Sequence, residues 1–130
     1  EMLETFDIDV CILAMNPTQY GDFAEVALPA ARERNVGVVA MKVMRNLVGK
    51  EGTTPKELMD YALQREGVAT AVIGHVGMDV FEQNLRLVRE FDGRPTARVD
   101  RRQLERRLAK YAGPEHLCWA RPDYFDGMMC

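Results

Sequence analysis

Three short apolar runs alternate with amphipathic segments along this chain, and this order constrains the fold more than any other feature. The runs are residues 7–15, 36–44 and 68–76. Each is rich in valine, isoleucine or alanine and fits a strand. Residues 36–44 are nearly continuously apolar without alternation, which is typical of a strand buried on both faces of a parallel sheet. The sequence therefore predicts an α/β fold, with parallel strands and helices packed outside them.

Amphipathic segments follow each run, because their apolar residues recur at spacings of three and four. The pattern predicts helices over residues 22–35, from Thr54-Pro55 onward, over 79–91 and over 100–112. Pro29 lies inside the first of these and predicts a kink, since proline removes a backbone donor. Three parallel strands are few for an independent sheet, whose outer strands would expose unpaired backbone groups. Periodicity leaves two folds open, a small doubly wound sheet and a slice of a (β/α) barrel whose other strands lie upstream.

The charge and length of the chain exclude several classes of protein. A net charge of -3 over 130 residues argues against a general binder of nucleic acids or membrane surfaces, which needs a basic face. The apolar runs are far shorter than the roughly 20 residues that span a bilayer. We expect a soluble, cytoplasmic protein. Because Glu1 is not a start methionine, we also expect a cut chain, and any targeting signal would lie upstream.

The cysteines do not indicate a metal site. Cys11, Cys118 and Cys130 have no CxxC spacing and no nearby pair of histidines. Zinc sites and disulfide frameworks both leave such spacings in a sequence. We predict no metal.

Two stretches carry a resemblance to a known family. NVGVVAMKVM (35–44) and TPKELMDYALQREGVATAVIGHVGMDVFEQNLRLV (54–88) resemble the last two strand-helix units of the aldo-keto reductase family, especially its bacterial branch with an Ala-Met-Lys strand. The resemblance runs from about residue 6 to residue 91. It implies the C-terminal portion of a (β/α)8 TIM barrel in residues 1–91, with strands six to eight. Residues 92–130 would add a C-terminal helix and an aromatic tail packing on the barrel.

The resemblance implies a part of an NAD(P)H-dependent oxidoreductase that reduces aldehydes or ketones to alcohols. Barrel sites lie at the C-terminal ends of the strands. By position in the family, the cofactor-binding residues would be Met41, Lys42, Gly74, His75, Val76, Gly77, Gln83 and Asn84. Many relatives carry a Lys-Ser pair at the Gly74 and His75 positions and an arginine at the Val80 position, where positive charge selects the 2′-phosphate of NADP, and these cations are absent here. NADPH remains the expected cofactor and NADH the alternative, with Arg45, Lys50 or His75 as substitute cations.

No residue of this chain matches the family's catalytic tyrosine, lysine, aspartate or histidine, so we assign no catalytic residue, and Tyr20 and Lys42 are not replacements. The implied partners are a small carbonyl substrate and either the missing N-terminal part of the barrel or another copy of the chain. A different class of function is a non-catalytic half-barrel that binds nucleotide or phosphate and associates with another chain. A flavodoxin-like regulator ranks last, because it needs an acidic cluster at the strand ends and the sequence has no such cluster.

Plainer interpretations accompany each of these residues. Lys42 could extend into solvent, and Met41 could pack in the core. His75 could be structural, and Asn84 could be a solvated residue of a helix. The charged run 101–107 is typical of a solvated helix face. The aromatic residues of the tail would cover a barrel end or reach over the substrate mouth, and we favour the first; they are Trp119, Tyr124 and Phe125.

Overall fold

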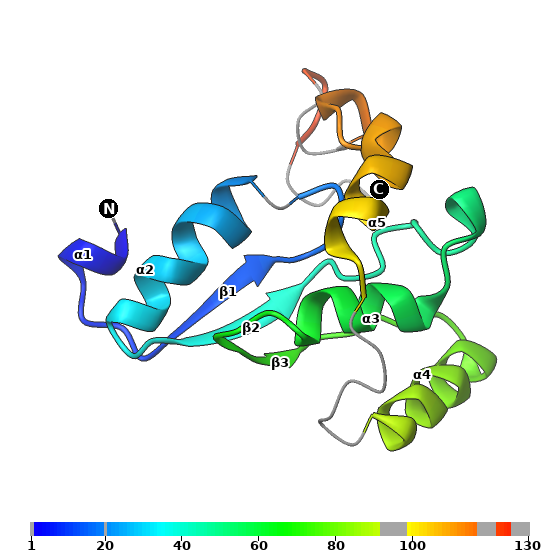
Figure 1. Cartoon of the computed structure of the whole chain (residues 1–130), viewed down its shortest axis with the longest axis horizontal. Coiled ribbons are helices and arrows are strands. Elements are labelled where there is room, and N and C mark those ends of the chain that lie inside the picture. The colour runs from blue at the N-terminus through cyan, green and yellow to red at the C-terminus, as the bar shows by residue number, and fades with distance from the viewer. Residues whose placement is uncertain (1, 20, 92–98, 117–121, 126–130) are drawn as a thin grey trace.

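The computed structural model describes residues 2–19, 21–91, 99–116 and 122–125, and it has a mixed α/β fold (Figure 1). Its main elements are α1 (Met2–Thr5), β1 (Val10–Ala14), α2 (Leu28–Glu33), β2 (Gly37–Met41), α3 (Pro55–Leu63), β3 (Val68–Ala71), α4 (Met78–Glu90) and α5 (Arg101–Leu108). A π-helical segment (Gly21–Ala27) precedes α2, and 3-10 turns lie at Lys50–Gly52, Ala109–Tyr111 and Pro114–His116. The predicted α/β class is confirmed.

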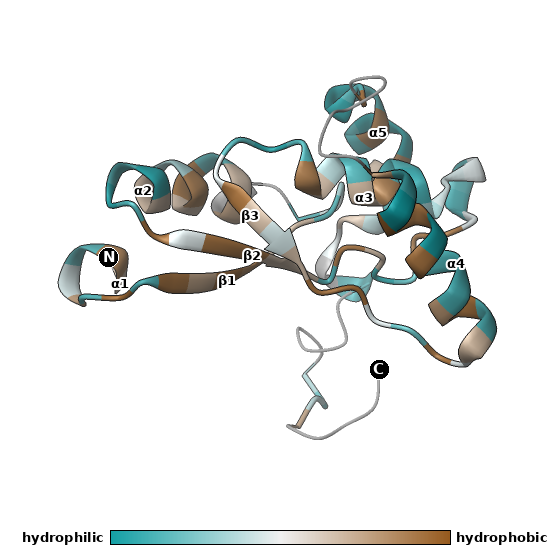
Figure 2. Ribbon diagram, turned by 90° about the horizontal axis from the view of Figure 1, so that it is seen from below, coloured by the Kyte–Doolittle hydropathy of each residue, from teal (hydrophilic) through white to brown (hydrophobic). Residues whose placement is uncertain are grey.

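The three strands form one parallel sheet in chain order, β1-β2-β3. Ile12 pairs with Val39 across the first strand pair, and Ala40 pairs with Ala71 across the second. α2 contacts β2, α3 contacts β3, and Figure 2 shows both helices on the same side of the sheet. Each strand therefore reaches its neighbour by a crossover over one face, and the C-terminal ends of all three strands meet at one edge.

The hydrophobic core lies between that face and the helices. Val38 and Ala40 of β2 are fully buried there, because alternate side chains of a strand point to one face. The helices contribute buried side chains from α2, α3 and α5, namely Leu28, Ala31, Leu58, Tyr61, Ala62, Leu104 and Leu108. α5 thus extends the core, and it forms the first part of the helix predicted over residues 100–112.

The opposite face of the sheet is not covered by the described residues. Val10, Ile12 and Val72 are exposed to 58%, 59% and 61%. The sequence predicted burial on both faces for residues 36–44, and on the open face Val39 and Met41 of β2 are only half-buried. Both crossovers use the same side of the sheet, so neither crossover helix covers this face.

Pro29 divides the predicted helix over 22–35. The α-helical part begins at Leu28, so that Pro29 occupies its first turn, where a missing N–H costs little. The preceding turns, Gly21–Ala27, are π-helical. The sequence predicted a kink at Pro29, and the structure has a change in helix type just before it.

Local sequence signals determine where α3 begins and how the chain turns from α3 into β3. Thr54 caps its N-terminus in a capping box, in which the Thr54 hydroxyl accepts from the N–H of Glu57 and the Glu57 carboxylate accepts from the N–H of Thr54. The predicted start at Thr54-Pro55 is confirmed. After α3, Gly67 has φ +96, and a Cβ there would lie 2.6 Å from Cγ of Arg32. Only glycine fits this turn into β3.

The third strand and the fourth helix differ from their predictions. β3 ends at Ala71 instead of reaching residue 76, although the Val72 N–H still donates to Ala40 O at 2.8 Å. The predicted helix over 79–91 is present as α4, but none of its residues is buried, and Phe81 and Val88 are exposed to 39% and 52%. Its apolar stripe is thus only partly covered by the described residues.

The aromatic tail is described only in part. Trp119, like Tyr20, lies outside the described residues. Tyr124 is half-buried and Phe125 is exposed. Separately, none of the helices in the described ranges combines the length and the apolar composition that a bilayer span requires.

Candidate functional site

The predicted cofactor residues from two strands lie at the edge of the sheet where the strands end, which we call the rim. Ala40 of β2 pairs with Ala71 of β3, so the residues that follow these strands leave the sheet side by side. Met41 and Lys42 follow Ala40, and the turn 74–77 follows β3 by two residues. The structure therefore brings the two groups to the same rim. In (β/α) folds this is the edge that carries the site.

Met41 and Lys42 occupy different positions on the rim. Met41 is the last residue of β2 and is half-buried, on the face of the sheet that the helices leave open. Lys42 is exposed, with φ +55, and its carbonyl accepts a hydrogen bond from Asn16 Nδ2 at 2.9 Å. The backbone of Lys42 is thus fixed while its side chain reaches the surface.

The turn after β3 leads directly into α4. Gly74, His75 and Val76 are exposed, Val76 to 89%. The ring of His75 lies against Phe81 with centroids 5.2 Å apart. Gly77 precedes α4 with φ +86, a value that favours glycine, and no side chain caps this helix. The turn therefore presents backbone and one imidazole to the outside.

Asn84 joins α4 back to this turn. Its Nδ2 donates to Gly74 O at 3.4 Å, which links the second turn of the helix to the end of the strand segment. Gln83 next to it is exposed. Asn84 thus links α4 to the glycine turn.

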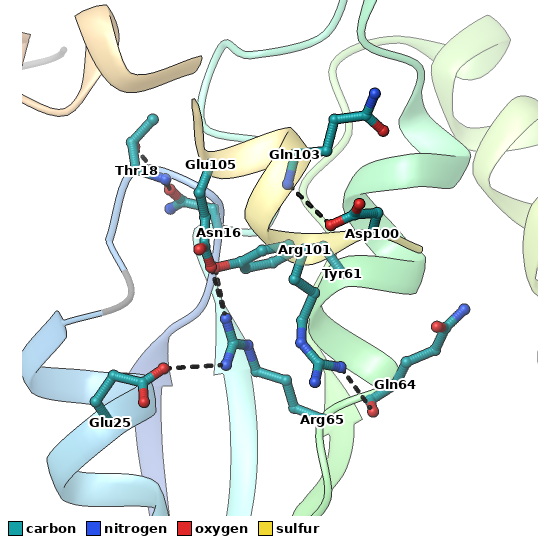
Figure 3. A network of polar contacts seen from close by, with 10 residues as sticks. All are labelled: Asn16, Thr18, Glu25, Tyr61, Gln64, Arg65, Asp100, Arg101, Gln103 and Glu105. Carbon is teal, nitrogen blue, oxygen red and sulfur yellow. Dashed lines mark hydrogen bonds and ion pairs between the residues drawn. The ribbon is translucent and has the colours of Figure 1, made fainter. Parts of the chain in front are cut away.

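Sequence reasoning missed one buried polar cluster at the rim, the turn after β1. Asn16 is fully buried, and its Oδ1 accepts from the Thr18 N–H at 2.9 Å and from Thr18 Oγ1 at 2.7 Å (Figure 3). Asn16 Nδ2 also donates to Gln19 Oε1 at 3.1 Å. An Asn-Pro-Thr sequence after an apolar run is a signal for such a turn, because asparagine side chains bond backbone two residues on.

Arg45 is one of the three cations that the sequence offers as substitutes at a cofactor phosphate. Its guanidinium bonds two other segments of the chain. Its Nη1 donates to Thr18 Oγ1, and its Nη2 donates to His116 O at 2.9 Å. Burial lowers the pKa of Arg45 from its usual value. Lys50 lies 5.7 Å from the centre of the Tyr111 ring. Of the three predicted substitute cations, His75 is the one that lies within the glycine turn 74–77.

A second polar cluster connects α3 with α5 and is shown in Figure 3. Tyr61 Oη donates to Glu105 Oε1 at 2.5 Å, and Arg65 Nη2 donates to Tyr61 Oη at 2.6 Å and to Glu105 Oε1 at 3.2 Å. Glu25 lies 3.7 Å from Arg65 Nη1. Burial, and then the bond to Glu105, raise the pKa of Tyr61. This tyrosine is fully buried and therefore cannot meet a substrate.

A large cavity adjoins this second cluster and not the rim. It has a volume of about 880 Å³ and is lined by Gly67 and Val68, where β3 begins, and by Arg65, Arg101 and Glu105. It therefore lies at the opposite end of β3 from the predicted cofactor residues. Its buried charges bond one another, which is an arrangement that ties helices together.

Over the part of the chain that the structure describes, no three His, Cys, Asp or Glu side chains gather closely enough to hold a metal ion. Comparison of the sequence with models of protein families finds no match, and comparisons with curated proteins and with solved structures find none either.

Proposed function

We propose that this chain is the cofactor-binding side of an NAD(P)H-dependent oxidoreductase that reduces aldehydes or ketones, built as strands six to eight of a (β/α)8 barrel. The observation that carries the proposal is the meeting of Met41, Lys42 and the turn 74–77 at one rim of the sheet. They come from two regions of the sequence that resemble aldo-keto reductases. The structure supports the proximity of these residues. That they bind a nicotinamide cofactor is what we propose.

The sheet topology supports a barrel over a doubly wound sheet. In a doubly wound sheet the crossover helices cover both faces, whereas in a barrel they all lie outside. Here α2 and α3 lie on one side, and the other face carries the exposed side chains of Val10, Ile12 and Val72. Barrel interiors are filled by such branched apolar residues. These side chains would face the inside of the cylinder.

The fourth helix supports the same conclusion. None of the residues of α4 is buried, and its exposed apolar side chains include Phe81 and Val88. Such side chains are suited to contact further barrel units.

The rim fits a dinucleotide better than a metal or a nucleic acid. Its exposed elements are a glycine-bounded turn, an uncapped helix N-terminus and one lysine, which together can approach a phosphate-sugar backbone. Asp79 stands in the first turn of α4 and adds a negative charge there. No cation of the described residues neighbours Gly77 in sequence, so we propose that NADH binds comparably to NADPH.

The test replaces Asn84 by alanine and measures the Kd of NADPH and of NADH by fluorescence titration of the 130-residue chain. Loss of the bond from Asn84 to Gly74 and of the proposed adenine contact should weaken both affinities about tenfold. Gln103→Ala is the matched control, because Gln103 is an exposed amide on α5. Equal affinities of wild type and both variants would contradict a cofactor site at the rim.

A further inference from the structure

The loop that follows β2, residues 42–53, has an unusual backbone, and we call it the rim loop. Four of its non-glycine residues have left-handed φ values, +55 at Lys42, +33 at Arg45, +56 at Asn46 and +48 at Glu51. Such residues raise the free energy of a loop and persist where surrounding contacts determine the conformation. The contacts that hold this loop are therefore informative about its role.

A ring of hydrogen bonds closes around Lys42. Arg45 Nη1 donates to Thr18 Oγ1, Thr18 Oγ1 donates to Asn16 Oδ1 at 2.7 Å, and Asn16 Nδ2 donates to Lys42 O at 2.9 Å. The chain then runs from Lys42 to Arg45 and completes the ring. Asn16 and Thr18 are buried, so their geometry is fixed by packing. The ring transmits the position of the Arg45 guanidinium to the backbone of Lys42.

The C-terminal segment 109–116, which we call the strap, holds the rim loop at two places. Arg45 Nη2 donates to His116 O at 2.9 Å. Further along the loop, Glu51 Oε1 accepts from Tyr111 Oη at 3.2 Å and pairs with Lys110 Nζ at 2.6 Å. The strap follows α5 directly, and α5 is anchored in the core by Leu104 and Leu108. The loop is thus fastened to a rigid element far along the sequence.

We propose that Arg45 is a positioning residue, which fixes Lys42 at the rim through Thr18 and Asn16 and is itself held by the strap. Its guanidinium suits this task because its planar fork donates in two directions at once, which a lysine ammonium does less well. The relevance of this positioning to a dinucleotide rests on the proposed function. The positioning itself can be measured without any ligand.

The experiment compares Arg45→Ala with wild type by hydrogen exchange and mass spectrometry on the 130-residue chain. Amides of the rim loop that are hydrogen-bonded, such as those of Leu47, Gly49 and Thr53, should exchange about tenfold faster in the variant. Amides of α3 should not change. Arg106→Ala is the charge-matched control, since Arg106 is an exposed arginine on α5. Unchanged exchange in the rim loop, or equal acceleration in every element, would overturn the proposal.

Two further variants keep the result decisive if Arg45→Ala folds poorly. Thr18→Val keeps the shape of the side chain but breaks the ring, so it should loosen the same amides. Arg45→Lys should restore part of the protection. NADPH titration then adds a separate readout, in which Arg45→Ala weakens binding about tenfold at a temperature where the variant is folded. Absence of NADPH binding by wild type would reject the proposed function, while the exchange data still decide the role of Arg45.

Discussion

Replacing Glu105 by glutamine should lower the free energy of unfolding by about 3 kcal/mol, because it leaves a charged guanidinium in the core without its nearest counterion. The side chains of Arg65 and Glu105 are exposed to only 8% and 15%. In the variant Arg65 keeps Tyr61 and the more distant Glu25, and its buried Nε already has no partner. Urea unfolding followed by circular dichroism measures the change.

Glu66→Gln is the matched control for this prediction. Glu66 also pairs with an arginine, Arg32, but both side chains are largely exposed, at 78% and 45%. Exposed ion pairs contribute about 1 kcal/mol at most, because water screens them and ordering the side chains costs entropy. A loss as small for Glu105→Gln as for Glu66→Gln would show that the cluster between α3 and α5 does not hold the two helices together.

The 130-residue chain alone should not reduce aldehydes with NADPH. Reduction needs a general acid at the cofactor, and enzymes of this kind accelerate reactions by a factor of at least about a million. The Tyr61 hydroxyl is buried and donates to Glu105, and the Tyr111 hydroxyl donates to Glu51, so both hydroxyls are already engaged in contacts that hold the fold together. The decrease in NADPH absorbance should match that of a heat-killed sample.

Turnover clearly above the heat-killed sample would contradict the assignment of the chemistry to other barrel strands. A longer polypeptide that supplies a tyrosine and a lysine on upstream strands should restore activity. If such a polypeptide binds NADPH but stays inactive, the non-catalytic half-barrel becomes the better description. In both cases the rim retains its proposed role in nucleotide binding.

Much of the fold was predictable because local signals determine it. The apolar runs locate β1 and β2 within a few residues, and the Thr54-Pro55 pair locates the start of α3. The burial of the runs was not predictable in the same way. Whether Ile12 is covered depends on which side the crossovers take and on what lies opposite, and neither is encoded in the run itself. The same holds for α4, whose stripe requires a partner surface.

The site was predictable where strand ends define it and not where distant segments meet. Gly74, Gly77 and Lys42 can be placed at the rim from strand order alone. The contact of Arg45 with His116 spans 71 residues, and the contact with Thr18 spans 27. Long-range contacts of this kind leave no local pattern. Sequence reasoning therefore picked out Arg45 as a cation but could not predict its bonds to Thr18 and His116.

NMR titration of the isotope-labelled chain with NADPH tests the central claim most directly, because it reports where a dinucleotide binds without any need for turnover. We expect the largest shifts of backbone amides at residues 41–42, 74–77 and 83–84, and smaller shifts in the rest of the rim loop. Shifts that instead cluster at the cavity around Arg65 and Arg101, or no shifts at millimolar NADPH, would contradict a nucleotide site at the C-terminal ends of these strands.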